Sequence, residues 1–239
     1  MPLPKIATPT YELELPSTGS SINYRPFLVK EEKVLVIALE SEDNKQITTA
    51  IKSVLKNCIL SKGIKVEDLP TFDIEYLFLN IRGKSVGEDL EVNIICPDDE
   101  KTQVPVTIAL DEIEVQKDDN HTNKIKIDDP IMMEMKYPSL DQFIKNNFDF
   151  NEKNMMDQSF DLIATCIDKV YTEDEVWTAA DCTKKEMRDF LEQMNSYQFK
   201  EIETFFETMP KLSHTISVTN PKTKVKSDVV LEGLSSFFA

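Results

Sequence analysis

TFDIEYLFLNIRGKSVGEDLEVNIICPDDEKTQVPVTIAL, residues 71–110, shows two kinds of periodicity within one stretch. In its first half, apolar residues recur every three or four positions, which predicts a helix ended by Gly83 or Gly87. In its second half, apolar and polar residues alternate on both sides of the polar segment 97–101, which predicts a β-hairpin. The helical positions are Ile74, Leu77, Phe78 and Ile81, and the alternating ones are Leu90, Val92, Ile94, Cys96, Val104, Val106, Ile108 and Leu110. The stretch therefore predicts an α+β fold.

A second helix is predicted on the N-terminal side of this stretch. Its apolar stripe is Ile47, Ala50, Ile51, Val54, Leu55, Cys58 and Ile59. Asp43 followed three residues later by Gln46 is typical of a helix N-cap. Residues 30–40 fit either a helix or a buried strand, because residues 34–39 are apolar throughout.

Short strands are predicted on both sides of these elements. Residues 11–15 and 22–26 flank a turn at residues 16–19 and predict a hairpin. Residues 124–127 and 131–137 predict two more strands, joined by the turn Asp128-Asp129-Pro130.

From Ser139 the pattern is helical to near the end of the chain. Helices are predicted from Ser139, over about 155–171, from Thr183, and up to Pro210. This change in composition predicts two domains: a mixed α/β domain over 1–138, with hairpins plus two helices, and a mainly helical domain over 139–239 with a short C-terminal tail.

Composition excludes several classes of function. The 239 residues carry 43 acidic and 27 basic side chains, for a formal net charge of −16. A protein that binds nucleic acid or anionic lipid through phosphate contacts needs a basic surface, so neither partner is expected.

No run of 18 apolar residues predicts a membrane span, and the N-terminus does not resemble a signal peptide. Four dispersed Cys fit reduced thiols in a cytosolic protein.

No catalytic, metal or cofactor site is predicted. The five glycines form no phosphate-binding loop, and no G-x-S-x-G motif accompanies the only two histidines, His121 and His214. A zinc site uses paired Cys or His ligands, whereas Asp98 and Asp99 stand where a zinc knuckle after Cys96 would have its second cysteine. The acidic clusters all fall at predicted turns, where Asp bonds its own backbone.

The end of the chain is the one candidate binding segment. A short apolar face is formed within the last nine residues by Leu231, Leu234, Phe237 and Phe238. Such a tail either packs back on its own domain or anchors to a partner in a groove. Both interpretations fit the sequence.

Several longer strings carry a resemblance to a known family. They are PSTG at 16–19, YRPFLVKEEK at 24–33, DIEYLFL at 73–79, KSVGE at 84–88, HTNKI at 121–125, MKYPSLD at 135–141 and LEGLSSFF at 231–238. Together they resemble the baseplate hub proteins of T-even-type contractile-tailed bacteriophages. The resemblance implies a non-enzymatic role in the phage tail, as a baseplate hub subunit or as a factor required for assembly of the hub.

The resemblance also implies the partners, which are other tail and baseplate proteins, and self-association is open. The chain would occur in the host cytoplasm during assembly and in the virion tail baseplate. The alternative hypothesis is a transient tail assembly chaperone that masks apolar helices of another tail protein and is absent from the mature virion. A third hypothesis, a hydrolase of the host cell wall, lacks an acid pair, a zinc cluster or a triad in this sequence.

Overall fold

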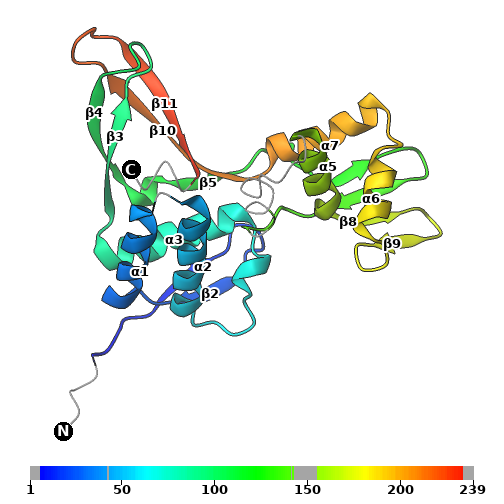
Figure 1. The fold of residues 1–239 in the computed structure, drawn as a ribbon, viewed down its shortest axis with the longest axis horizontal. Helices are drawn as coiled ribbons and strands as arrows, with labels where there is room; N and C mark the ends of the chain where they lie inside the picture. Colours follow the sequence, from blue (N-terminus) through cyan, green and yellow to red (C-terminus); the bar gives the residue numbers. More distant parts are fainter. Residues whose placement is uncertain (1–5, 42, 141, 143–154, 234–239) are drawn as a thin grey trace. The chain divides into compact units, whose positions relative to one another are not determined.

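The structure is a computed structural model that describes residues 6–41, 43–140, 142 and 155–233 (Figure 1). The chain divides into two compact units. Unit 1 contains residues 1–66, 72–116 and the chain from 211 onward, and unit 2 contains residues 67–71 and 117–210. Each unit combines helices with antiparallel strands, so the predicted α+β class is confirmed.

The helices of unit 1 are α1 (Val29–Glu40), α2 (Asn44–Cys58) and α3 (Thr71–Val86), with a 3-10 turn at Val66–Asp68. The ambiguity at residues 30–40 is thus resolved as a helix. The predicted cap of α2 is confirmed, since Asp43 Oδ1 accepts from the backbone N–H groups of Lys45 and Gln46. Apolar side chains of α2 and α3 are fully buried, among them Leu55, Cys58, Ile74, Leu77 and Ile81.

The first predicted hairpin is confirmed as β1 (Tyr11–Glu14) and β2 (Ser21–Tyr24), which pair antiparallel. Its turn is fastened to α3, because the backbone N–H of Ser17 donates to the buried carboxylate of Asp73 at 3.0 Å. The second hairpin is confirmed as β3 (Asp89–Ile95) and β4 (Gln103–Ala109).

Unit 1 also contains a three-stranded sheet from distant parts of the chain. Its strands are β5 (Glu114–Gln116), β10 (Lys211–Thr219) and β11 (Lys226–Glu232), in the order β11-β10-β5. One apolar cluster joins this sheet to the β3–β4 hairpin: Leu79, Leu90, Val92, Ile94, Ile108, Ile113, Leu212, Ile216, Val218 and Leu231. The two long hairpins run side by side in Figure 1.

In the part of unit 2 that the structure describes, a four-stranded antiparallel sheet is accompanied by α5, α6 and α7. The strands, in spatial order, are β6 (Lys124–Lys126), β7 (Met132–Met135), β8 (Ile167–Tyr171) and β9 (Val176–Thr178). The helices are α5 (Met155–Cys166), α6 (Lys184–Leu191) and α7 (Ser196–Thr208). The predicted strands at 124–137 are confirmed, as is the helix start at Thr183, whose hydroxyl and Glu186 form a capping box.

The structure corrects the expectation of a mainly helical C-terminal part. The predicted helix over 155–171 ends at Cys166, and residues 167–171 form β8. The segment from 211 to 232 forms the β10–β11 hairpin, which the sequence reading missed. The reason is tertiary pairing: β8 pairs with β7, and β10 pairs with β5, which lies about a hundred residues earlier in the chain.

The compact units also divide the chain elsewhere than at residue 138. That position lies inside unit 2, between the paired strands β7 and β8. The start of the predicted helix at Ser139 is described only to Leu140 and at Gln142, and the rest of it lies outside the described residues.

Candidate interaction surface

Both histidines bond within their own compact unit. In unit 2, His121 Nδ1 lies 2.9 Å from Thr208 Oγ1 and Nε2 lies 2.9 Å from Tyr137 Oη. The imidazole also packs on the rings of Tyr137 and Phe205. Burial lowers the pKa of His121, so the ring is held neutral. In unit 1, His214 Nδ1 lies 3.1 Å from the backbone oxygen of Glu112.

The buried cysteines are poor nucleophiles. Burial raises the pKa of Cys58 to about 11 and that of Cys166 to about 12, so both stay as thiols at neutral pH. Cys96 is also buried, with a raised pKa. Within the described residues, no group of three or more His, Cys, Asp or Glu could hold a metal ion. In the same residues, no helix is long and apolar enough to span a membrane.

The two acids at the β3–β4 turn accept hydrogen bonds, Asp99 within the turn and Asp98 from another hairpin. Asp98 accepts from Asn220 and Thr223, which ties the tip of the β3–β4 hairpin to the tip of the β10–β11 hairpin. Asp99 accepts from both the backbone and the hydroxyl of Thr102. These bonds lower the pKa of both carboxyls, led by Thr223 for Asp98 and by Thr102 for Asp99. Their role is structural.

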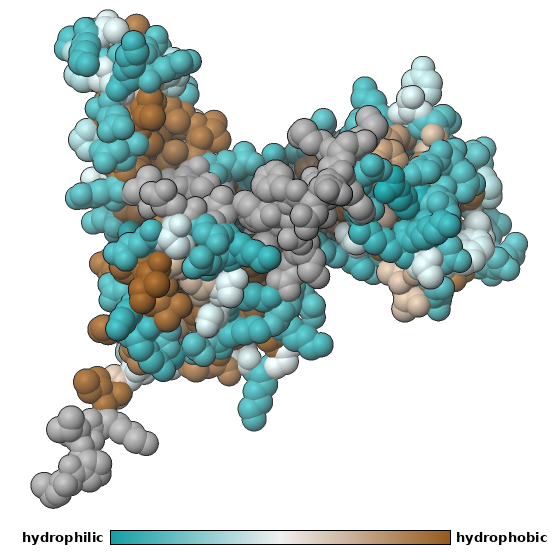
Figure 2. Space-filling view, viewed as in Figure 1, coloured by the Kyte–Doolittle hydropathy of each residue, from teal (hydrophilic) through white to brown (hydrophobic). Residues whose placement is uncertain are grey.

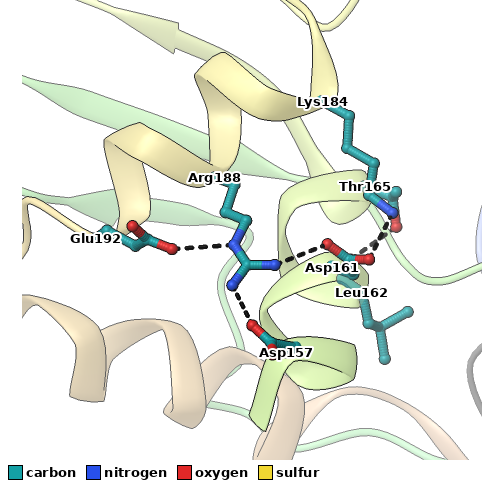
Figure 3. A network of polar contacts seen from close by, with 7 residues as sticks. All are labelled: Asp157, Asp161, Leu162, Thr165, Lys184, Arg188 and Glu192. Carbon is teal, nitrogen blue, oxygen red and sulfur yellow. Dashed lines mark hydrogen bonds and ion pairs between the residues drawn. The ribbon is translucent and has the colours of Figure 1, made fainter. Parts of the chain in front are cut away.

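A further cluster of acids in unit 2 is paired with basic side chains of the same unit (Figure 3). Arg188 on α6 bonds Asp157 and Asp161 of α5, and its Nε donates to Glu192 at 2.9 Å. Lys184 Nζ lies 3.1 Å from the second oxygen of Asp161. The carboxylates therefore meet two cations of the same unit, and the cluster fastens α6 to α5.

Helix α1 carries the most unusual surface among the described residues. Its inner side is a single narrow stripe of Glu31, Leu35 and Ala38, all buried. Five aliphatic side chains lie outside this stripe and are exposed to between 38% and 79%: Val29, Val34, Val36, Ile37 and Leu39, here called the α1 ridge. Figure 2 shows hydrophobic surface where Figure 1 places α1. Exposed aliphatic side chains gathered on one helix indicate an interaction site.

The backbone of α1 is firmly placed below this ridge. The buried Glu31 side chain accepts from Arg25 Nη2 at 3.0 Å and from the backbone N–H of Leu28 at 2.8 Å. These hydrogen bonds and ion pairs lower the pKa of Glu31 against the opposing effect of its burial, so the carboxylate stays charged. A shallow groove runs between α1 and α2, lined by Lys30, Glu31, Val34, Ser53, Val54 and Asn57. The start of the helix that carries the ridge is thus fixed by hydrogen bonds to a buried carboxylate.

Unit 2 has a smaller exposed apolar area of its own. Val176 and Trp177 lie on β9, which is an edge strand of the four-stranded sheet, and are 58% and 39% exposed. An edge strand with unpaired backbone groups can receive another chain. Two aromatic or aliphatic side chains make a smaller target than the five of the α1 ridge.

The sequence-derived binding residues at the chain end lie elsewhere. Leu231 is on β11, only 6% exposed, and belongs to the apolar cluster of unit 1. Leu234, Phe237 and Phe238 lie outside the described residues. The sequence left residues 30–40 open between a helix and a buried strand, and so it did not indicate which side chains of this segment stay exposed. The available signal was that the apolar run at residues 34–39 covers every side of a helix, more than one buried stripe requires.

Comparison with known proteins decides the family. The family model described as T4 bacteriophage base plate protein matches residues 8–239. The chain belongs to this family. The match spans residues of both compact units, so the matched region contains the α1 ridge and the paired hairpins of this chain. No curated protein and no solved structure matches the chain.

A baseplate is an assembly of proteins, and membership of the family supports a structural role in the phage tail. Other tail and baseplate proteins are the partners such a role requires. The resemblance inferred from the sequence is thus confirmed at the level of a T4-type baseplate protein.

Proposed function

We propose that this chain is a subunit of the baseplate hub, or a factor required for assembly of the hub, and that it acts through protein–protein contacts without catalysis. The family match over residues 8–239 carries the proposal. The α1 ridge supports it, because exposed aliphatic side chains gathered on one helix fit a protein contact. The chain works in the host cytoplasm during assembly and, as a hub subunit, in the tail baseplate.

The test is quantitative mass spectrometry of purified virions and of baseplates isolated before tail attachment. A hub subunit is expected in both, at a copy number fixed relative to the other baseplate proteins. A factor that only promotes hub assembly is expected in the early baseplates and not in virions. Absence from both preparations, with normal baseplates formed in cells lacking the chain, would reject the proposal.

The second candidate is a transient tail assembly chaperone that masks apolar helices of another tail protein. Two features favour it: the exposed α1 ridge and a formal charge of −16, which suits a soluble holder of amphipathic clients. It predicts a complex with one tail protein before assembly, and loss of the chain from finished particles. A stoichiometric copy number in virions rejects this candidate and leaves the hub subunit.

The segment after Gly233 is proposed as a second partner contact, with Leu234, Phe237 and Phe238 as the anchoring side chains. Leu231 is excluded from the test because it packs in the apolar cluster of unit 1. Truncation after Gly233 leaves β11 complete. Reduced co-purification with tail proteins, at unchanged circular dichroism, supports the anchor. Unchanged co-purification of a folded truncated protein removes it.

A further inference from the structure

We propose that the outward part of the α1 ridge, Val29, Val36 and Ile37, lies in the contact between two copies of this chain, in which the two α1 helices cross antiparallel about the point between Val36 and Ile37. The inference rests on the proposed function, which treats this face as a protein contact. It adds that the partner is a second copy of the chain. It is carried by the placement of charges on the outward side of the helix.

The outward side of α1 follows from the buried stripe. A helix turns about 100° per residue, so the side opposite Glu31, Leu35 and Ala38 is made of Val29, Lys33, Val36, Ile37 and Glu40. All five are exposed. From its N-terminal to its C-terminal end, the outward side of α1 therefore presents an apolar residue, a basic residue, two apolar residues and an acidic residue.

An antiparallel pair of such helices is self-complementary. With a two-fold axis between Val36 and Ile37, Val36 of each copy lies against Ile37 of the other, and Lys33 of each copy lies against Glu40 of the other. Two ion pairs then lie at the two ends of an aliphatic centre. Parallel packing in register would instead set Lys33 against Lys33 and Glu40 against Glu40, which is repulsive.

The two charges are available for this contact. In the part of the chain that the structure describes, no ion pair or side-chain hydrogen bond involves Lys33 or Glu40. They stand seven residues apart, about two helical turns, so they do not reach each other within one copy. A contact made of one helix from each copy is at the small end of specific interfaces, so the dimer is expected to be reversible.

The decisive experiment exchanges the charges in the full-length chain. Sedimentation velocity over a concentration series, at about 150 mM salt, where the long-range repulsion between copies of net charge −16 is screened, measures self-association of the wild type, of Lys33→Glu and of Glu40→Lys. Each single variant places like charges opposite each other twice and is expected to dimerise about tenfold more weakly. An equimolar mixture of the two variants again pairs opposite charges and is expected to recover wild-type association, as is the double variant.

Two further variants complete the design. Ile37→Asp puts a charge at the crossing point and is expected to give a monomer, while Val230→Asp, at an exposed valine on β11, is the control that should dimerise like the wild type. Circular dichroism verifies that each variant is folded. A wild-type chain that stays monomeric at all concentrations, or a dimer that is indifferent to the charge exchanges, would overturn the inference.

The experiments can reject this inference without rejecting the proposed function, and can reject the proposed function without rejecting this inference. A monomeric wild type that still binds baseplate proteins, and loses them on Ile37→Asp, assigns the ridge to another protein and overturns this inference alone. A dimer that follows the charge exchanges, in a chain that is absent from baseplates and dispensable for their assembly, overturns the proposed function alone.

Discussion

At the scale of single residues, the polar groups that first suggest chemistry serve packing. His121 joins a loop to α7 and to the end of β7 through its two ring nitrogens. Asn220 joins two hairpin tips, with its amide group donating to both oxygens of Asp98 at 3.1 Å. Their partners lie 16 to 122 residues away in sequence, which is why neither role could be predicted from local pattern.

The neutral state of His121 makes unit 2 sensitive to pH. Burial lowers the folded-state pKa of this histidine, so below about pH 6.5 the unfolded state binds a proton that the folded state does not. Unit 2 should therefore lose stability as the pH falls from 7.5 to 5.5, and His121→Gln should flatten that dependence. Thermal unfolding followed by the fluorescence of Trp177, the single tryptophan and a residue of unit 2, measures it.

The control for this prediction is His214→Gln. That residue belongs to unit 1, and its replacement should leave the pH dependence of the Trp177 signal as in the wild type. An equal slope in His121→Gln and in the wild type would show that another group causes it.

The link between the hairpin tips should contribute measurably to the stability of unit 1. Asn220 is 1% exposed, and Asn220→Ala leaves Asp98 and the turn N–H groups of Lys222 and Thr223 without its amide. We expect a loss of about 1–3 kcal/mol in the free energy of unfolding. Urea unfolding followed by circular dichroism measures it. Asn93→Ala, at an exposed position of β3, should change stability by less than about 0.5 kcal/mol, and equal effects would contradict the assignment.

At the scale of the element, α1 is a helix with one buried stripe and an exposed apolar remainder. Its sequence is apolar over residues 34–39, yet only Leu35 and Ala38 of that run are buried. Exposed aliphatic side chains add nothing to the core of the free chain. They remain available for burial in an assembly.

Truncation on the two sides of α1 should therefore differ sharply. Leu35→Ala, at a residue 7% exposed, removes core packing and should cost about 2–5 kcal/mol in the free energy of unfolding. Ile37→Ala, at a residue 55% exposed, should change it by less than about 0.5 kcal/mol, and alanine is the better helix former. Chemical unfolding of the dilute chain compares them. A large cost for Ile37→Ala would mean that its side is part of the core.

The elements predicted from sequence are those with strong local signals. The caps at Asp43 and Thr183 lie two to three residues from their partners, and the β3–β4 hairpin alternates over fourteen positions. The α5–β8 boundary was missed because Ile163, Ile167 and Val170 fit helical spacing, while pairing with β7 decides the strand. The β10–β11 hairpin depends on β5, and no local pattern encodes that partner.

At the candidate site, too, features with a local sequence signal could be predicted, whereas those set by tertiary packing could not. The sequence predicted that the acidic clusters occupy turns, and the bonds of Asp98 and Asp99 agree. The sequence also contains none of the catalytic motifs considered above. The α1 ridge could not be located, because which side of a uniformly apolar helix is buried depends on α2 and the rest of unit 1.

At the scale of the whole molecule, the charge of −16 lies on the surface of a protein with apolar cores in both units. Like-charged copies repel at long range, so the net charge keeps the chain soluble while the α1 ridge is uncovered. A partner with a basic surface would be attracted by the same field.

Association with such a partner should be slowed by salt. Raising the salt concentration from about 50 mM to about 500 mM shortens the screening length severalfold, and we expect the association rate with baseplate proteins to fall by about tenfold. Biolayer interferometry with the purified full-length chain measures this rate. A rate independent of salt would restrict the role of the charge to solubility.

The most direct measurement follows the chain through baseplate assembly. Lysates of infected host cells are fractionated by sedimentation, and this chain and the baseplate proteins are quantified in each fraction, with and without an intact gene for the chain. We expect the chain to sediment with baseplate proteins at some stage of assembly, and complete baseplates to be lost without it. A chain that sediments alone throughout infection, with complete baseplates formed in its absence, would contradict a role in the baseplate.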